Sequence, residues 1–286
     1  MKQYKISKTT NPRVISYLEW GNPQSSHKTL CVHGLTRNSR DFDFLAQSLC
    51  QSPHPPHIIC PDMAGRGQSD WLTNSADYNN QTYLSDCLEL ISHLGWRRYD
   101  WIGTSMGGIL GMFAAAMADS PINKLILNDI GPFIPKAALQ RIADYLKSKL
   151  PEFKNIAEAE KHLRLIHAPF GLLTDQQWRH LATHGTREIN TKPGSFEMHY
   201  DPCIADAFTE HIDDVEFWPV WENCHAQVVL LRGQHSDILL QSTAKQMQKQ
   251  NKLIEFHEFP NVGHAPALMV ADQINVVKNA LFAKSM

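Results

Sequence analysis

The sequence predicts an α/β protein with a mostly parallel central sheet, flanking helices and an inserted helical cap. Short apolar runs alternate with amphipathic segments over residues 14–132, and this alternation returns after residue 222. Such a pattern is typical of a parallel sheet whose two faces are covered by helices. Between these parts the chain has helical periodicity and lacks similar apolar runs. We therefore predict a core domain at residues 1–132 and 222–286, with a cap at 133–221.

Apolar or alternating runs bounded by turn residues predict the first strands, and 3.6-residue periodicity predicts the helices between them. The strands are expected at 14–20, 29–34, 57–63, 98–103 and 124–132, and the helices at 39–50, 83–94 and directly after residue 105.

The same patterns continue through the second half. In the cap, helices are expected at 137–150, 156–166 and 174–183; after it we expect a strand at 227–233, a helix at 242–249, a strand at 253–259 and a final helix from Ala265 to about Phe282.

Composition excludes several classes of function. The 286 residues carry a net charge of −2, which gives no sign of a nucleic-acid or membrane-surface partner. The first residues lack the apolar core of a secretory signal, and no apolar run approaches the roughly 18–20 residues that span a bilayer. We therefore expect a cytoplasmic protein. The sequence leaves the oligomeric state open.

Cysteine and histidine spacing does not predict a metal centre. The six cysteines contain no C-x-x-C pair, so neither a cysteine metal site nor a disulfide framework is expected. His180 and His184 have the spacing of two ligands on one helical face, but no third ligand is obvious nearby. We predict that no metal and no cofactor is required.

The best-defined motif runs from Gly103 to Gly107, where Gly-Thr-Ser-Met-Gly follows an apolar run and precedes a helical one. A serine between glycines at a strand-to-helix corner is the G-x-S-x-G nucleophile elbow. The small glycines let the backbone close tightly while Ser105 projects at the helix N-terminus, which favours a developing negative charge. Because the short pattern also arises by chance, its context must carry the assignment.

A nucleophilic serine needs a base, and the base needs an orienting group. His264 follows the last predicted strand, so it should lie at the same sheet edge as Ser105. For the acid we favour Asp237, after the strand at 227–233, because one strand fewer separates it from His264. Asp129, which ends the strand at 124–132, is the alternative.

An oxyanion hole needs two preorganised N–H donors. We expect these from Met106, directly after the nucleophile, and from Leu35, in the loop after the strand at 29–34. The His33 side chain is expected to brace that loop and not to act as a second base.

Taken in order, these motifs resemble the α/β-hydrolase superfamily, in its serine esterase and lipase-like branch. The resemblance covers residues 14–131 and 225–283, with Asp62-x-x-Gly65-x-Gly67-x-Ser69 as a further element. In this family an insertion at the position of residues 133–221 is a helical cap over the active site. Ser105 excludes the branches with an aspartate nucleophile.

The cap offers candidates for substrate binding. Phe133, Trp178 and Trp221 can line an apolar pocket, although aromatic residues in such segments more often join the cap to the sheet. For Arg37, two residues beyond Leu35, two interpretations have equal weight: it holds a substrate carboxylate, or it is a solvated or loop-bracing arginine.

The predicted function is a serine hydrolase that cleaves small to medium carboxylic esters through an acyl-enzyme intermediate. Alternatives on the same triad are an acyltransferase, a perhydrolase or haloperoxidase-like enzyme, and a C–C bond hydrolase; the loop after His33-Gly34 weakens the last. A non-catalytic ligand-binding protein of the same fold is the alternative from another class.

Overall fold

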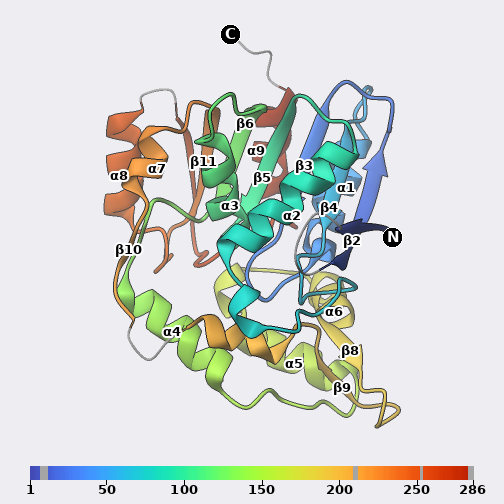
Figure 1. Cartoon of the computed structure of the whole chain (residues 1–286). Coiled ribbons are helices and arrows are strands. Elements are labelled where there is room, and N and C mark those ends of the chain that lie inside the picture. The colour runs from blue at the N-terminus through green and yellow to red at the C-terminus, as the bar shows by residue number, and fades with distance from the viewer. Residues whose placement is uncertain (7–11, 209–211, 252–253, 283–286) are drawn as a thin grey trace.

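The computed structural model describes residues 1–6, 12–208, 212–251 and 254–282. Its centre is an eight-stranded sheet with the order β1-β2-β4-β3-β5-β6-β11-β12 (Figure 1). The strands are β1 (Lys2–Ile6), β2 (Arg13–Gly21), β3 (Lys28–Val32), β4 (His57–Pro61), β5 (Tyr99–Thr104), β6 (Ile122–Asn128), β11 (Gln227–Gly233) and β12 (Glu255–Phe259). This arrangement confirms the predicted mostly parallel sheet.

The antiparallel part of the sheet lies at its N-terminal edge. β1 pairs with β2, and β2 pairs with β4, both antiparallel, whereas β4, β3, β5, β6, β11 and β12 follow one another in parallel. β1 was not expected from the sequence, because only its last residue, Ile6, is buried and its apolar signal is weak.

Helices cover both faces of the sheet. α1 (Asp43–Cys50) and α9 (Ala271–Phe282) pack on one face, where Leu45 and Val277 share a core cluster with strand residues such as Ile102. On the other face lie α2 (Asn80–His93) and α3 (Met106–Ala115), with α8 (Gln241–Gln250) contributing Met247 to the larger cluster. The alternating sequence therefore builds three layers, as such a pattern predicts.

Between β6 and β11 the chain forms a layer below the sheet in Figure 1. Its helices are α4 (Lys136–Lys147), α5 (Ile156–Ile166) and α6 (Asp175–Gly185), whereas α7 (Trp218–Glu222) lies beside α8 at the left of the sheet. The expectation of helix alone is corrected, because β7 (Phe133–Ile134) pairs with β10 (Val215–Glu216) and β8 (Thr186–Glu188) pairs with β9 (Phe196–Met198). These strands are two or three residues long, too short to leave an apolar pattern in the sequence.

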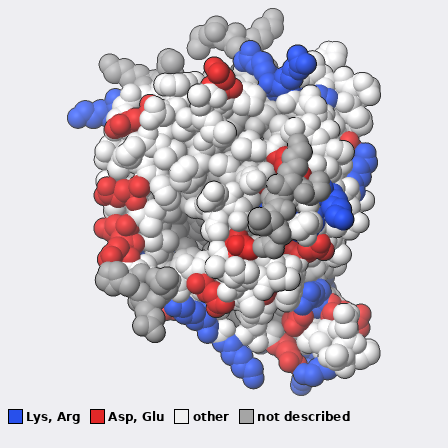
Figure 2. Space-filling model, in the orientation of Figure 1, with Lys and Arg blue, Asp and Glu red and all other residues white. Residues whose placement is uncertain are grey.

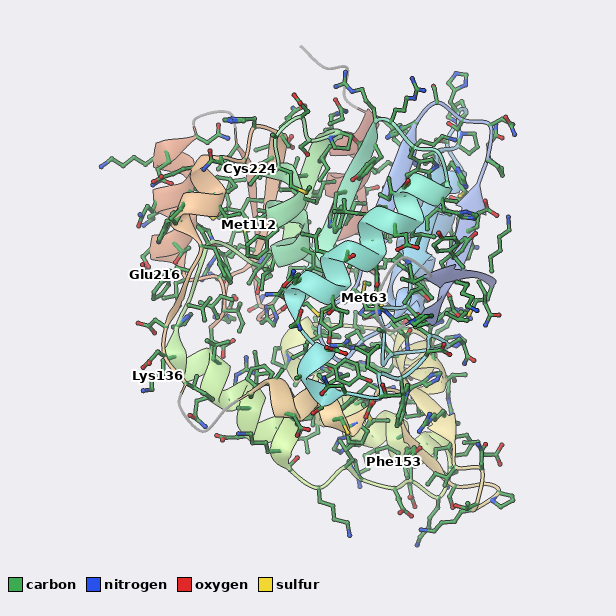
Figure 3. The ribbon with its side chains drawn as sticks, viewed as in Figure 1. Met63, Met112, Lys136, Phe153, Glu216 and Cys224 are labelled. Carbon is green, nitrogen blue, oxygen red and sulfur yellow. The ribbon has the colours of Figure 1, made fainter. Side chains whose placement is uncertain are left out.

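The β7–β10 pair joins the outgoing and returning chain of this layer. Ile134 is opposite Val215, and Phe133 is opposite Glu216. Lys136 and Glu216 mark the two sides of this crossing in Figure 3. A short ladder here ties both ends of the inserted segment together, close to where it leaves the sheet.

Other helix boundaries differ modestly from expectation. α6 begins after Thr174, whose side chain forms a capping box with Gln177. The last helix begins at Ala271 and not at Ala265, because residues 265–270 form the loop that follows His264. The predicted strand at 253–259 falls partly on residues 252–253, which lie outside the described residues.

The surface carries charges of both signs. On the face shown in Figure 2, acidic and basic side chains are scattered around a largely uncharged centre. Within the described ranges, every helix is too short or too polar to cross a bilayer.

Candidate active site

The nucleophile elbow is formed by β5, Ser105 and α3. Ser105 has φ 52° and ψ −116°, a conformation that is unusual for a residue with a side chain. A Cβ on Gly103 would lie 2.2 Å from the Gly107 carbonyl oxygen, and one on Gly107 would lie 2.0 Å from the Val32 carbonyl oxygen. The turn therefore requires glycine at both flanking positions, as its sequence indicates.

A continuous hydrogen-bonded chain runs from Ser105 through His264 to Asp129. His264 Nε2 lies 2.9 Å from Ser105 Oγ, and His264 Nδ1 lies 2.8 Å from Asp129 Oδ2. His264 sits in the loop between β12 and α9, whereas Asp129 directly follows β6. An acid that bonds Nδ1 leaves Nε2 free to accept the serine proton.

Asp129 is held by more than His264. Its side chain is fully buried, Oδ1 accepts the Gly233 N–H at 2.8 Å, and Oδ2 accepts the Ser236 hydroxyl at 2.5 Å. Its own N–H donates to the Leu231 carbonyl at 2.8 Å. Three donors around one carboxylate, from His264, Gly233 and Ser236, fix its direction.

The preference for Asp237 as the partner of His264 is corrected by this geometry. The Asp237 carboxylate is 47% exposed and accepts hydrogen bonds from both Nε and Nη2 of Arg141, on α4. The end of β11 and the loop after it still support Asp129, through Gly233 and Ser236. Counting strands from His264 therefore gave the wrong order of preference between the two aspartates.

The proposed oxyanion donors meet at the mouth of α3. Met106 is the first residue of α3, so its N–H has no partner within the helix ladder. Leu35 borders the same cavity as Ser105 and Met106. A Cβ on Gly34 would lie 3.7 Å from Ser105 Cβ, so this loop packs directly against the nucleophile.

Arg66 positions the Leu35 loop, a role that the sequence did not reveal. Its buried guanidinium donates from Nε to the Leu35 carbonyl and from Nη1 to the Ala64 carbonyl, both at 2.7 Å. It also lies over the Tyr83 ring, 4.6 Å from the centroid. From the sequence, an arginine inside the glycine-rich loop at 64–69 is expected to serve that loop, as its bond to Ala64 shows, whereas its bond to Leu35 left no signal.

His33 braces the same loop, as expected. Its Nδ1–H donates to the Gly34 carbonyl at 2.7 Å, and its Nε2 accepts the Met63 N–H at 3.0 Å. Burial lowers the pKa of His33 to about 4, so the ring is neutral near neutral pH. Both ring nitrogens are occupied by backbone groups, which leaves none for proton transfer.

An apolar cavity of about 410 Å³ opens at Ser105. Its apolar walls include Ile109, Ile130, Ile134, Leu139, Ile142, Val215, Phe217 and Ile238. α3, α4 and the β7–β10 crossing therefore shape the space beside the nucleophile. The sequence did not predict these residues, because some lie on helices with the spacing of ordinary core residues and the others lie in short strands or loops that give no periodic signal.

None of the four expected substrate contacts is among the described residues that line this cavity. Phe133 belongs to the β7–β10 ladder, and Trp178 and Trp221 are 5% and 3% exposed within the packing. Arg37 is also buried, and Nε and Nη2 bind Asp41. The bulky aromatics join layers instead of facing the cavity.

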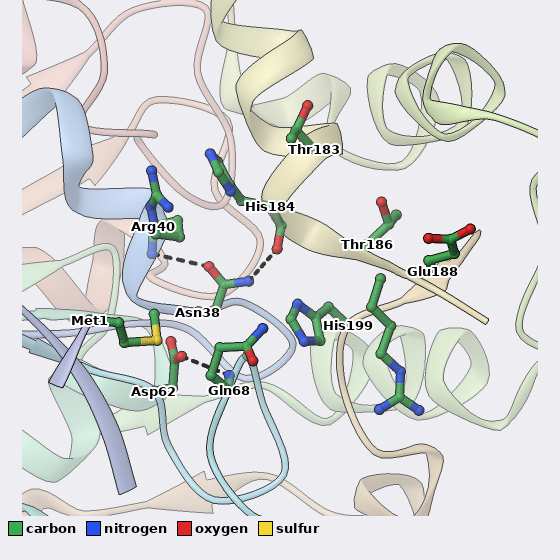
Figure 4. Close-up of a pocket in the computed structure, with 12 residues that line it drawn as sticks. Met1, Asn38, Arg40, Asp62, Gln68, Thr183, His184, Thr186, Glu188 and His199 are labelled. Atoms are coloured by element: carbon green, nitrogen blue, oxygen red, sulfur yellow. Dashed lines mark hydrogen bonds between the residues drawn. The ribbon is translucent and has the colours of Figure 1, made fainter. Parts of the chain in front are cut away.

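A second, more polar cavity of about 300 Å³ lies against α6 (Figure 4). Near it, possible ligand atoms of Asp43, His180 and His184 come within 4.8 Å of one another, so the structure supplies the third group that the sequence did not reveal. However, His180 Nε2 is 2.9 Å from the Arg40 carbonyl, and Arg40 Nε donates to Asp43 at 2.6 Å. Because the Arg40 charge already neutralises Asp43, we assign no metal here.

Comparison with known proteins places this geometry in a family. The model of the alpha/beta hydrolase family matches residues 29–275. The chain belongs to the alpha/beta hydrolase family. Like other members, it is an α/β-fold hydrolase, and several of its relatives carry the names hydrolase, esterase or lipase.

Relatives of this alpha/beta hydrolase match nearly its whole length. The 3-hydroxybutyrate-oligomer hydrolase of Cupriavidus necator is 38% identical over 269 residues, which is 92% of this chain and 90% of the relative. A protein from Rickettsia typhi of known crystal structure is 36% identical, with a TM-score of 0.92 and 99% of each chain covered. An alpha/beta hydrolase from Novosphingobium aromaticivorans is 29% identical, with a TM-score of 0.84, over 98% of this chain and 97% of the other.

Proposed function

We propose that this hydrolase cleaves small to medium carboxylic esters through an acyl-enzyme intermediate on Ser105. The observation that carries the proposal is the hydrogen-bonded chain from Ser105 through His264 to Asp129. A serine hydroxyl is a weak nucleophile until an oriented base accepts its proton, and this chain supplies that arrangement.

In acylation, Ser105 Oγ attacks the ester carbonyl carbon while His264 Nε2 takes the hydroxyl proton. The carbonyl oxygen becomes an oxyanion, which the Leu35 and Met106 N–H groups stabilise. Protonated His264 then gives its proton to the leaving alcohol, and the C–O bond breaks. Asp129 keeps Nδ1–H in place and stabilises the transient imidazolium.

Deacylation repeats these steps with water. His264 Nε2 removes a proton from water, the resulting oxygen nucleophile attacks the acyl carbon, and Ser105 regains its proton as the free acid leaves. No step in this sequence needs a cofactor, so the cofactor-free prediction is part of the proposal.

We propose that residues 133–221 act as a cap and that the apolar cavity receives the acyl group. Ile134, Leu139 and Ile142 contribute cavity wall from this segment, while Ser105 and Met106 contribute it from the core. An acyl chain here would be removed from water at both of these surfaces, which favours burial of its methylene groups.

Esters of short hydroxy acids are the substrates to test first. The relative from Cupriavidus necator is named for 3-hydroxybutyrate oligomers, and the match between the two proteins covers 92% of this chain. Its substrates join small acyl units through ordinary carboxylic ester bonds, the bond that the proposed chemistry cleaves.

The experiment is a comparison of the wild type with Ser105→Ala on p-nitrophenyl butyrate and on linear 3-hydroxybutyrate dimers. The variant should lose turnover by several orders of magnitude, and a fluorophosphonate probe should label only the wild type. Retention of the wild-type rate in Ser105→Ala contradicts the proposal. Product analysis with an added alcohol, thiol or peroxide separates hydrolysis from acyl transfer.

A further inference from the structure

Several buried polar atoms near the elbow lack hydrogen-bond partners. Among the described residues, these include Arg37 Nη1 and Nε2 of His167, whereas the Tyr145 and Tyr200 hydroxyls interact with each other and with no other described group. Arg37 is 6% exposed and Tyr200 is 1% exposed, so neither is satisfied by open solvent at the surface. Buried polar atoms in native proteins are nearly always paired, so such a group indicates a binding partner.

Arg37 begins directly beside the nucleophile. A Cβ on Gly34 would lie 3.7 Å from Ser105 Cβ and 3.9 Å from Arg37 Cγ, so both side chains flank the same glycine. At its far end, Arg37 Nη1 would lie 3.1 Å from a Cβ on Gly185, the last residue of α6. The guanidinium therefore lies between the elbow loop and the inserted segment.

His167 lies next to the loop that carries His264. It precedes the short turn Ala168–Phe170, whose Pro169 carbonyl accepts the Gly263 N–H at 2.7 Å. Gly263 is the residue before His264. A Cβ on Gly263 would come within 2.9 Å of the Pro169 Cβ, so the turn packs tightly on the His264 loop.

Electrostatic effects connect these side chains in pairs: Arg37 with His167, Arg37 with Tyr145, and Tyr145 with Tyr200. Burial lowers the pKa of His167 well below its usual range, and Arg37, His162 and His264 lower it further. Burial raises the pKa of Tyr145, against the effects of the Tyr200 hydroxyl and of Arg37, and burial together with Tyr145 raises the pKa of Tyr200. The two tyrosines and the histidine are therefore neutral near neutral pH.

The unpaired atoms are well suited to an anion with several acceptor lone pairs. Arg37 Nη1 can only donate, and the Tyr145–Tyr200 pair of hydroxyls keeps one O–H free to donate, on Tyr145. Arg37 keeps its charge, because Asp41 raises its pKa against the effect of burial. Asp41 binds Nε and Nη2, which balances the charge of Arg37 and leaves Nη1 without a hydrogen-bond partner.

The cluster lies on the leaving-group side of the nucleophile. His264 must give a proton to the leaving oxygen, so the alcohol part of an ester has to lie beside His264. His167 and its turn pack on the His264 loop, whereas the apolar cavity lies along Met106 and Ile109 on α3. The acyl and alcohol parts therefore meet surfaces of different polarity.

We propose that Arg37, Tyr145, Tyr200 and His167 form a subsite that binds a carboxylate on the alcohol part of the substrate. The inference rests on the proposed ester hydrolysis and narrows its substrate class to esters of hydroxy carboxylic acids. The subsite places the negative end of the leaving alcohol on the guanidinium while the neutral acyl group enters the apolar cavity.

The test compares two esters that differ at one group. One is the butyryl ester of 3-hydroxybutyrate, and the other is its carboxamide analogue, which has the same shape without the charge. Release of butyrate gives kcat/KM for each. A charge-assisted hydrogen bond predicts that the wild type prefers the carboxylate about 10- to 100-fold.

Variants locate the source of this preference. Arg37→Gln should bring the carboxylate-to-carboxamide ratio of kcat/KM close to one, chiefly by raising KM for the carboxylate ester. Tyr145→Phe keeps the packing of the ring and should lower this ratio a few-fold. Arg179→Gln is the matched control, because Arg179 lies on the exposed side of α6 and pairs with Glu160. It should leave the ratio at the wild-type value.

The outcomes separate the subsite from the proposed reaction. A wild-type ratio near one, or an unchanged ratio in a folded Arg37→Gln protein, overturns the subsite while ester hydrolysis stands. If Arg37→Gln does not fold, the wild-type ratio and Tyr145→Phe decide. If Ser105→Ala retains turnover, the proposed reaction mechanism is wrong. The subsite is then tested directly by comparing how much 3-hydroxybutyrate and its amide raise the melting temperatures of the wild type and of Tyr145→Phe.

Discussion

Replacing Asp129 with asparagine tests which acid orients His264. The substitution keeps the size of the side chain but removes its charge in a fully buried position. In the wild type, Oδ2 accepts from His264 Nδ1 and from the Ser236 hydroxyl, and Oδ1 accepts from the Gly233 N–H. An asparagine offers one oxygen in place of two, so at least one of these donors loses its partner.

The expected cost follows from these contacts. If the amide nitrogen faces His264, it favours the tautomer whose proton is on Nε2, which cannot accept the proton of Ser105. Loss of the oriented base in a serine triad reduces turnover by about 10⁴-fold, which corresponds to about 5 kcal/mol of transition-state stabilisation. We expect kcat for p-nitrophenyl butyrate to fall by about 10³- to 10⁴-fold, with a much smaller change in KM.

Asp237→Asn is the matched control. Asp237 is 47% exposed, and its salt bridge with Arg141 is a surface contact of small energetic value. Its kcat should stay within about threefold of the wild type. Near-normal turnover by Asp129→Asn, or an equally large loss in both variants, would refute the assignment of Asp129; thermal unfolding curves check that both variants are folded.

Other predictions address the loop, the cavity, the elbow and stability. Arg66→Met should lower kcat about tenfold or more, because the Leu35 N–H loses its support, and a normal kcat would argue against that role. Leu139→Trp should fill the apolar cavity and lower kcat/KM for long acyl esters more than for acetate, whereas an unchanged chain-length profile would place acyl groups elsewhere. Gly107→Ala should lower the melting temperature by at least several degrees, since its Cβ meets the Val32 carbonyl; an unchanged melting temperature would mean that the turn can relax. Burial holds the pKa of His33 at about 4, so the free energy of unfolding should fall as pH falls from about 6.5 towards 4. His33→Gln should weaken this pH dependence in urea titrations. If the variant shows the same dependence as the wild type, other groups cause the acid sensitivity.

The core of the fold and the elbow are largely predictable from the sequence. Buried parallel strands require continuous apolar runs. The strand-to-helix corner at Ser105 requires glycine at two positions where the neighbouring backbone leaves almost no room for a Cβ. These local demands appear directly in the chain. The position of His264 was predictable too, since a histidine after the last strand lies at the same sheet edge as Ser105.

The acid and the cavity depend on tertiary contacts that leave weaker traces. Asp129 and Asp237 both follow strands, and what separates them is a ring of donors from the loop after β11. Likewise, Trp178 and Leu139 both lie on amphipathic helices, so periodicity alone cannot tell which faces the packing and which faces the cavity. The buried role of Arg37 depends on Asp41 and α6, which come together only in the folded chain.

The positions of Ser105 and Asp129 have a consequence for how this enzyme can vary. Both residues directly follow neighbouring strands, β5 and β6, and the Ser105 N–H donates to the carbonyl of Asn128, the residue before Asp129. The proposed nucleophile and acid are therefore held together through the backbone of adjacent strands. The segment around Asp237 bears no reacting group, yet its bond to Arg141 connects the core with α4. This segment is a natural place to alter how the substrate enters while the reacting groups keep their spacing.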